Sequence, residues 1–244
     1  MWLSCAILLS FLLTGCGEHK PATATVPPPP SLAESETSSE SPVETADLNE
    51  EKNTLRPSSK AKPILVEAGM ASWYGPPYNH HRASNGQVYD MNAMTAAHRT
   101  LPLDSIVRVT NLKTGHSAVV RITDRGPFIE GRILDLSEAA AKKIDVWLAG
   151  VAMVRMEVLR TPVPLDRGGR WAVQIGGFEK QHAANKEADH LSRRFPDAKV
   201  QCFSSPVGSW WVRVRVQNDA RQLAEEVLHH AQTSQAAIFL VRLD

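Results

Sequence analysis

Residues 105–123 read SIVRVTNLKTGHSAVVRIT, and this stretch decides the fold of the central part of the chain. Apolar and polar side chains alternate on both sides of Lys113-Thr114-Gly115-His116, which has the composition of a hairpin turn. Alternation with a period of two places one set of side chains on each face of a strand. The stretch therefore predicts two antiparallel strands with one buried face.

Further short strands surround this hairpin. The alternation predicts strands over residues 66–73, 132–136 and 153–159, and a short helix over residues 138–143 whose N-cap is Ser137. Many short strands with one small helix are typical of a compact β-barrel. We expect this all-β domain to occupy residues 64–160.

The C-terminal part of the chain has a different order of elements. Residues 161–169 are rich in Pro and Gly and predict a linker. Strands are predicted over residues 171–176, 198–203, 210–216 and 236–243, with helices over 180–195 and 220–231. Two strand–helix–strand units predict an α+β domain of the βαββαβ type over residues 170–244, with a four-stranded sheet and two helices on one face.

The first residues have the composition of an export signal. Residues 2–13 read WLSCAILLSFLL, which suits the apolar core of a signal peptide and is too short to cross a membrane. Leu13-Thr14-Gly15-Cys16 resembles a bacterial lipobox. The resemblance implies a lipoprotein signal peptide over residues 1–15 and an acylated, palmitate-bearing Cys16. Gly17 follows, with no Asp there, which by resemblance to Gram-negative lipoprotein sorting favours the outer membrane.

Residues 16–63 predict a disordered tether, because a PPPP block and an acidic, Ser/Thr-rich run cannot bury enough apolar surface to fold. The overall net charge of +1 is the sum of this acidic tether and a mildly basic remainder. So small a net charge argues against nucleic acid as a partner. Cys202 has no disulfide partner once Cys5 is removed and Cys16 is acylated. His80 and His81 have no carboxylate or thiol neighbours at metal-ligand spacing, so neither a metal nor another cofactor is expected.

Four blocks within the predicted barrel carry a family resemblance. They are GMASWYG (69–75), ASNGQVYDM (83–91), TAAHRTLP (95–102) and RITDRGPF (121–128). In this order they resemble the rare lipoprotein A family. The resemblance implies a double-psi β-barrel that acts as a lytic transglycosylase on peptidoglycan, with Asp124 and His98 among its catalytic residues.

Lytic cleavage of a glycosidic bond needs an acid that protonates the leaving oxygen and a base that takes the proton of the muramic acid 6-hydroxyl. Asp124 follows a strand in an Asp-Arg-Gly-Pro turn, where one carboxyl group facing a groove can do both. The alternative for Asp124 is a structural pair with Arg125 or a turn cap. His98 is expected to orient or polarise the substrate, or else to be a structural histidine.

Gln87 departs from the family pattern, because members with demonstrated activity carry Glu there. A Gln side chain can hydrogen-bond a sugar but cannot exchange a proton, and one acid–base group is worth about 10²–10⁴ in rate. Either Asp124 suffices, or Asp90 replaces the missing carboxylate, or Asp90 is a turn residue and activity is lost. These three possibilities remain open at the level of the sequence.

Aromatic and polar side chains are candidates for sugar contacts. In the barrel these are Trp73, Tyr74, Tyr78, Tyr89 and Arg125, with core packing as the alternative for some. In the C-terminal domain, WAVQIGGF (171–178) before an Ala-rich helix resembles a SPOR domain, which implies binding of glycan strands without stem peptides. The candidates there are Gln174, Phe178, Trp210, Trp211 and Arg213, and regular alternation would bury one of the two tryptophans.

The leading hypothesis is a monomeric, periplasm-facing lipoprotein, anchored through Cys16 and enriched at the septum, that cleaves naked glycan strands into 1,6-anhydromuramic ends during separation of daughter cells. The second hypothesis is a non-catalytic septal glycan-binding lipoprotein. A third is a wall-loosening module resembling expansins, which would create no new glycan ends.

Overall fold

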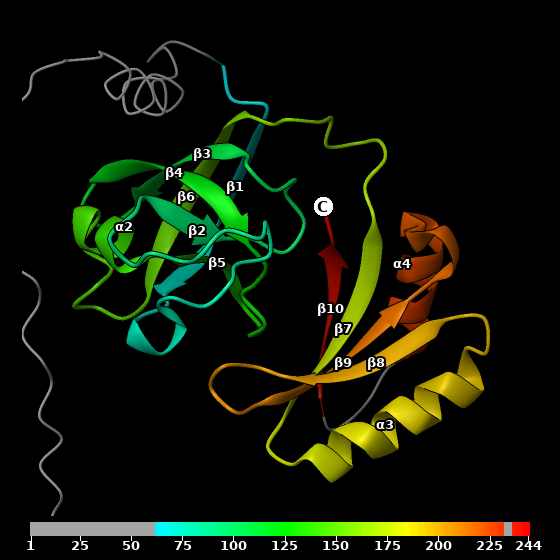
Figure 1. Ribbon diagram of the computed structural model, residues 1–244. Coiled ribbons are helices and arrows are strands. Elements are labelled where there is room, and N and C mark those ends of the chain that lie inside the picture. The colour runs from blue at the N-terminus through cyan, green and yellow to red at the C-terminus, as the bar shows by residue number, and fades with distance from the viewer. Residues whose placement is uncertain (1–61, 232–235) are drawn as a thin grey trace, which may run out of the picture. The chain divides into compact units, whose positions relative to one another are not determined.

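The computed structural model describes residues 62–231 and 236–244 (Figure 1). The predicted signal peptide, Cys16 and nearly all of the predicted tether lie outside these residues. The described residues belong to one compact unit and form a barrel followed by a sheet with helices.

Six strands close the first part into a barrel in the order β1-β5-β2-β4-β3-β6 (Figure 1). The strands are β1 Leu65–Trp73, β2 Thr95–Ala97, β3 Ile106–Asn111, β4 Ser117–Asp124, β5 Arg132–Leu136 and β6 Ala152–Arg160. Two of the pairings, β1 with β5 and β2 with β4, are parallel, and the other four are antiparallel. The predicted all-β barrel is confirmed.

The predicted hairpin over residues 105–123 forms β3 and β4, paired from Ile106 with Arg121 to Thr110 with Ser117. Its apolar positions, including Val107, Val120 and Ile122, are fully buried in the barrel core. Burial of one such side chain contributes about 1.5–3 kcal/mol, so the alternation alone is enough to fix which face turns inward.

Two details of the barrel position its groove. Helix α2, Glu138–Lys143, begins at Ser137, whose hydroxyl oxygen accepts a hydrogen bond from the Ala140 amide, as the sequence predicted. Strand β2 was not predicted, because three residues are too few to show a period. It is nonetheless fully buried and joins β4 to β5, so it sets the spacing of the strands on either side.

The second part has a four-stranded sheet in the order β10-β7-β9-β8 (Figure 1). Its elements are β7 Trp171–Phe178, α3 Gln181–Arg194, β8 Lys199–Ser204, β9 Trp210–Arg215, α4 Arg221–His230 and β10 Ala237–Arg242. Both helices contribute to one core cluster with a single face of the sheet, which confirms the predicted α+β arrangement.

Alternation on β9 sends its two tryptophans to opposite faces. Trp210 packs partly buried against the helix-side core, whereas Trp211 is 8% exposed on the other face. Within residues 62–231 and 236–244, no helix has the length and apolar character needed to cross a membrane.

Candidate active site

A groove of about 520 Å³ contains both acidic and aromatic side chains of the barrel. Asp124 and Asp135 line it together with Ala97, which lies between them on β2. Carboxyl groups in a partly enclosed groove with aromatic walls are suited to acid–base catalysis on a sugar.

Asp124 is held at the end of β4 by hydrogen bonds to one of its two oxygens. Asp124 Oδ1 accepts from the Ser84 amide at 3.0 Å, the Ser84 hydroxyl at 2.5 Å and the Arg125 amide at 2.8 Å. These three donors fix the orientation of the carboxyl group. Among the described residues, no donor forms a hydrogen bond with Oδ2, so this oxygen is available to a ligand.

The turn after Asp124 depends on Gly126, whose φ of 144° is one that side-chain-bearing residues rarely adopt. After this turn the backbone leaves the barrel wall and continues to Phe128. Asp124 is therefore the last residue of β4 and lies at the groove. Gly126, Pro127 and Phe128 themselves line the groove.

Asp135 is a groove residue that the sequence reasoning missed. Its side chain is 16% exposed, and its Oδ2 lies 3.3 Å from a guanidinium nitrogen of Arg132. Burial raises the pKa of Asp135 to about 6, in spite of the opposing charges of Arg132 and Arg99. The available signal was the polar position between Leu134 and Leu136, which alternation directs to the face opposite the core.

His98 was predicted to act on the substrate, but its side chain is not among the residues that line the groove. The ring is buried, and Nδ1 accepts hydrogen bonds from the amides of Thr100 and Leu101. Its Nε2 lies 3.7 Å from a carboxylate oxygen of Glu67, yet burial lowers the pKa of His98. The backbone amide of His98 donates to the Asp124 carbonyl at 3.1 Å, so His98 shapes the strand that carries Asp124.

Gln87 and Asp90 both lie on an exposed loop, and neither lines the groove. The Gln87 side chain accepts a hydrogen bond from the Asn85 amide group at 3.1 Å. Asp90 Oδ1 accepts from both the backbone and the side-chain nitrogen of Asn92, which is the geometry of a turn residue. The proposal that Asp90 replaces a missing carboxylate therefore gains no support from its position.

Three of the four barrel aromatics form a wall of the groove. Tyr74 packs on Tyr89 with 4.4 Å between ring centroids and on Tyr78 with 5.9 Å, and all three line the groove. Trp73 instead packs against the barrel core and Trp147. The structure therefore brings the tyrosines to the site and leaves Trp73 out of it.

Arg125 is buried and acts on the backbone around the site. Its guanidinium donates to the carbonyl oxygens of His98, Leu101 and Asp244 at 2.6–3.0 Å. Burial lowers its pKa to about 10, which leaves the group charged at neutral pH. These bonds make Arg125 a structural clamp, although part of the residue lines the groove.

The candidates of the second domain divide between the two faces of its sheet. Gln174, Trp211 and Arg213 line the groove, and Gln174 accepts a hydrogen bond from Arg213 at 2.9 Å. Gln174 and Trp211 are more buried than an open sheet face would leave them, because Phe128 packs on Trp211 with 5.4 Å between ring centroids. Phe178 lies with the helix-side core instead, beyond a register shift at Gly176.

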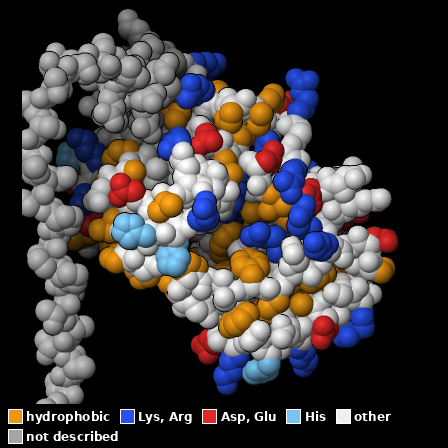
Figure 2. Space-filling view, viewed as in Figure 1, with side chains coloured by type: hydrophobic (Ala, Val, Ile, Leu, Met, Phe, Trp, Pro, Cys, Tyr) orange, Lys and Arg blue, Asp and Glu red, His pale blue; other side chains and the backbone are white. Residues whose placement is uncertain are grey.

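Basic side chains gather beside apolar ones over the sheet of the second domain in Figure 2. In this domain Arg170 and Arg215 both pair with the buried carboxylate of Asp219, and Arg221 lies over the ring of Trp171. Their partners show that these arginines stabilise the domain itself.

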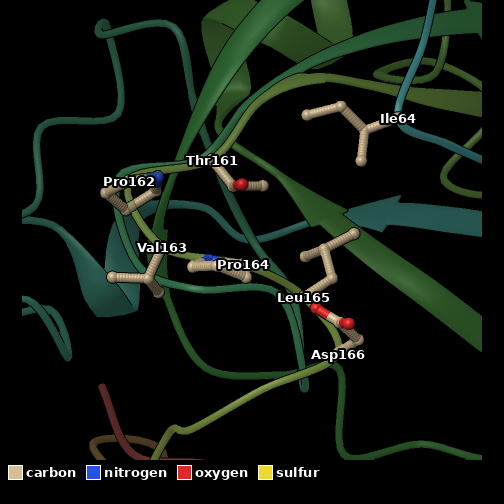
Figure 3. Close-up of a pocket in the computed structure, with 7 residues that line it drawn as sticks. All are labelled: Ile64, Thr161, Pro162, Val163, Pro164, Leu165 and Asp166. Atoms are coloured by element: carbon tan, nitrogen blue, oxygen red, sulfur yellow. The ribbon is translucent and has the colours of Figure 1, made fainter.

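A separate hollow of about 550 Å³ lies along the linker (Figure 3). Its lining runs from Thr161 to Asp166 with Ile64 and is mainly apolar, so it offers no pair of groups for acid–base work. The described residues contain no cluster of three or more His, Cys, Asp or Glu side chains that could hold a metal ion. Cys202 is a free, half-buried thiol.

Comparison with known proteins gives two family matches. Residues 66–156 match the model described as lytic transglycosylase, and residues 168–239 match the SPOR domain. The chain is similar to the endolytic peptidoglycan transglycosylase RlpA of Vibrio cholerae, with 57% identity over 41% of this chain and 38% of that protein. It is also similar to the protein of the same name from Helicobacter pylori, with 37% identity over 54% of this chain and 51% of that protein.

Among solved structures, the chain is similar to a Streptomyces papain inhibitor, with a TM-score of 0.34 and 19% identity over 41% of this chain and all of that one. The aligned part spans about a third to a half of the length of the curated relatives.

The fold and the groove define a double-psi β-barrel of the lytic transglycosylase class joined to a SPOR domain. The barrel and the domain that follows it are similar to the proteins named endolytic peptidoglycan transglycosylase RlpA.

Proposed function

We propose that this protein is an endolytic lytic transglycosylase that cleaves peptidoglycan glycan strands without stem peptides and leaves 1,6-anhydromuramic ends. The observation that carries the proposal is the carboxyl group of Asp124, which is fixed by three hydrogen bonds through Oδ1 in a residue that lines an aromatic-walled groove. The names of the relatives support the same substrate and reaction.

The reaction proceeds by general acid–base catalysis at the groove. A carboxylic acid gives its proton to the glycosidic oxygen, and the bond from that oxygen to muramic acid C1 breaks. The muramic acid 6-hydroxyl then attacks C1, and a carboxylate takes the hydroxyl proton, so no water enters the product. Asp124 reaches the substrate through Oδ2, and the tyrosine wall packs against the sugar rings.

The SPOR domain delivers the barrel to naked glycan, which is concentrated at the division septum. Gln174, Trp211 and Arg213, which line the groove, are the residues of this domain that we assign to glycan binding. The protein is a monomer, and Cys16 carries the acyl chains that hold it to the outer membrane on the periplasmic side. This anchoring rests on the lipobox-like sequence at residues 13–16.

Gln87 does not argue for a non-catalytic protein, because its side chain is exposed and lies outside the groove lining. The carboxylate that the groove needs has to come from a residue that lines it, and Asp124 is one.

The test is incubation of the full chain, kept in detergent, with glycan strands from which stem peptides have been removed. The expected product has 1,6-anhydromuramic ends, counted by mass spectrometry, and Asp124→Asn lowers their rate of formation by about 10²–10⁴. Asp197→Asn, a change on an exposed loop of the second domain, is the matched control. Wild-type protein that binds the glycan but forms no such ends would refute the proposal.

A further inference from the structure

The groove contains a second carboxyl group whose neighbours on the barrel wall are fixed by strand register. Ala97 of β2 pairs with Asp124 of β4 on one side and with Asp135 of β5 on the other. Residues in register on neighbouring strands present their side chains to the same face of a sheet. Asp124, Ala97 and Asp135 therefore form one row, and all three line the groove.

The opposite face of the same strands confirms this direction. Ala96 and Leu136 are each one position from the row, and Ile122 pairs with Ala96 on the other side of a register shift in β4; all three are fully buried in the barrel core. The row must accordingly face away from the core. Two strand spacings separate Asp124 from Asp135, which places their Cα atoms about 9–10 Å apart. Aspartate side chains at this separation can approach a substrate bond from two sides.

The two carboxyl groups have opposite surroundings. Asp124 Oδ1 accepts three hydrogen bonds, from the Ser84 amide, the Ser84 hydroxyl and the Arg125 amide. Among the described residues Asp135 accepts one hydrogen bond, from Arg132 at 3.3 Å to Oδ2, and its Oδ1 is buried without a hydrogen-bond partner. A protonated carboxylic acid fits these surroundings, because its O–H can donate to the glycosidic oxygen of a bound substrate.

The charged and titratable groups around Asp135 come from several elements. Arg132 on its own strand and Arg99, after β2, favour the carboxylate, whereas burial disfavours it and has the larger effect. Tyr74 and Tyr78 line the same groove as neutral phenols, since the pKa of each is raised, chiefly by burial. The net result is a pKa of about 6 for Asp135.

From this geometry we infer that Asp135 is the general acid of the reaction and Asp124 the base, so that the second carboxyl group comes from β5 and not from position 87. The inference rests on the proposed function. Asp135 gives its proton to the glycosidic oxygen as the C1–O bond breaks, and Asp124 accepts the proton of the 6-hydroxyl as the new C1–O6 bond forms. One proton is given and one is taken, so the pair returns to its starting state after proton exchange with solvent.

Asp135→Asn in the full chain tests this assignment against two substrates. The first is stem-peptide-free glycan, whose leaving sugar needs protonation. The second is the 4-nitrophenyl glycoside of N-acetylglucosaminyl-N-acetylmuramic acid, whose leaving group departs without an acid. Asp135→Asn should lose about 10²–10⁴ in rate on glycan and stay within about fivefold of wild type on the nitrophenyl glycoside. Asp124→Asn should lose activity on both.

The pH dependence gives a second readout. The wild-type rate on glycan should fall as the pH rises above about 6, because the acid is then ionised, and the nitrophenyl glycoside should not show this fall. Unchanged activity of Asp135→Asn on glycan, or an equal loss on both substrates, would overturn the assignment while leaving the proposed function in place. Wild-type protein inactive on both substrates would overturn the proposed function as well.

Discussion

The buried carboxyl group of Asp135 predicts a pH-dependent gain in stability for Asp135→Asn. Its pKa in the folded protein is about 6, against a value of 3.8 for a solvated Asp. Between those two values the native state binds more protons than the unfolded state, so the contribution of Asp135 to stability is lost as the pH rises from about 4 to about 6. Below pH 4 both states are protonated and no loss remains.

The magnitude follows from the size of the shift. About two pKa units correspond to about 3 kcal/mol at 1.36 kcal/mol per unit, and this is the cost of keeping Asp135 ionised at pH 7. Asn has the shape of the neutral acid, and its carbonyl oxygen can still accept from Arg132. Asp135→Asn should therefore match wild type near pH 4 and exceed it by up to about 3 kcal/mol at pH 7, or roughly 6–12 °C in melting temperature.

The assay is urea unfolding of the full chain at a series of pH values between 4 and 7.5, with pulsed hydrogen exchange and mass spectrometry of barrel peptides to follow the barrel alone. Subtracting the two proteins cancels the contribution of every other titrating group. Asp197→Asn, on an exposed loop, should give a flat difference. A difference between Asp135→Asn and wild type that does not grow between pH 4 and 7 would refute the reasoning.

Three further changes test the site and its support. Ser137→Ala removes the cap of α2 and leaves the Ala93 carbonyl without its donor, so the free energy of unfolding should fall by about 1–2 kcal/mol in the same urea assay. Gln87→Glu should change the rate of anhydro-end formation less than about threefold, because that side chain lies outside the groove, and a large gain would restore the importance of position 87. His98→Asn retains an acceptor for the Thr100 and Leu101 amides and should keep more activity than His98→Ala, measured as kcat on glycan, whereas equal loss in both would point to a proton-transfer role for the ring.

Local sequence patterns predicted most helices and strands of this chain, because each of these patterns is compatible with one type of secondary structure. The hairpin of β3 and β4 has alternating side chains long enough to define a face, and Ser137 before an Ala-rich run is a helix start with a mechanism. Strand β2 has only three residues, and its pairing with β4 and β5 depends on parts of the chain that are distant in sequence. No local pattern carries that information.

The residues of the site likewise divide into those that local sequence predicts and those that depend on the pairing of distant strands. Asp124 could be predicted because its strand end and turn are contiguous in the sequence. Asp135 belongs to the site only through its register with Ala97, which the sequence does not display, and its raised pKa depends on burial in the folded barrel. The position of His98 in a motif predicted importance, but its buried ring and amide partners make that importance structural.

On the barrel wall, the methyl group of Ala97 lies between the two aspartates, because Ala97 pairs with Asp124 on one side and Asp135 on the other. A sugar ring can therefore settle to van der Waals distance of the sheet and reach both carboxyl groups at once. Each methylene added at this position would lift the ring away from both groups together. The size of the residue at position 97 would therefore limit how closely a sugar ring approaches the sheet. It would decide which polymers the barrel can cut.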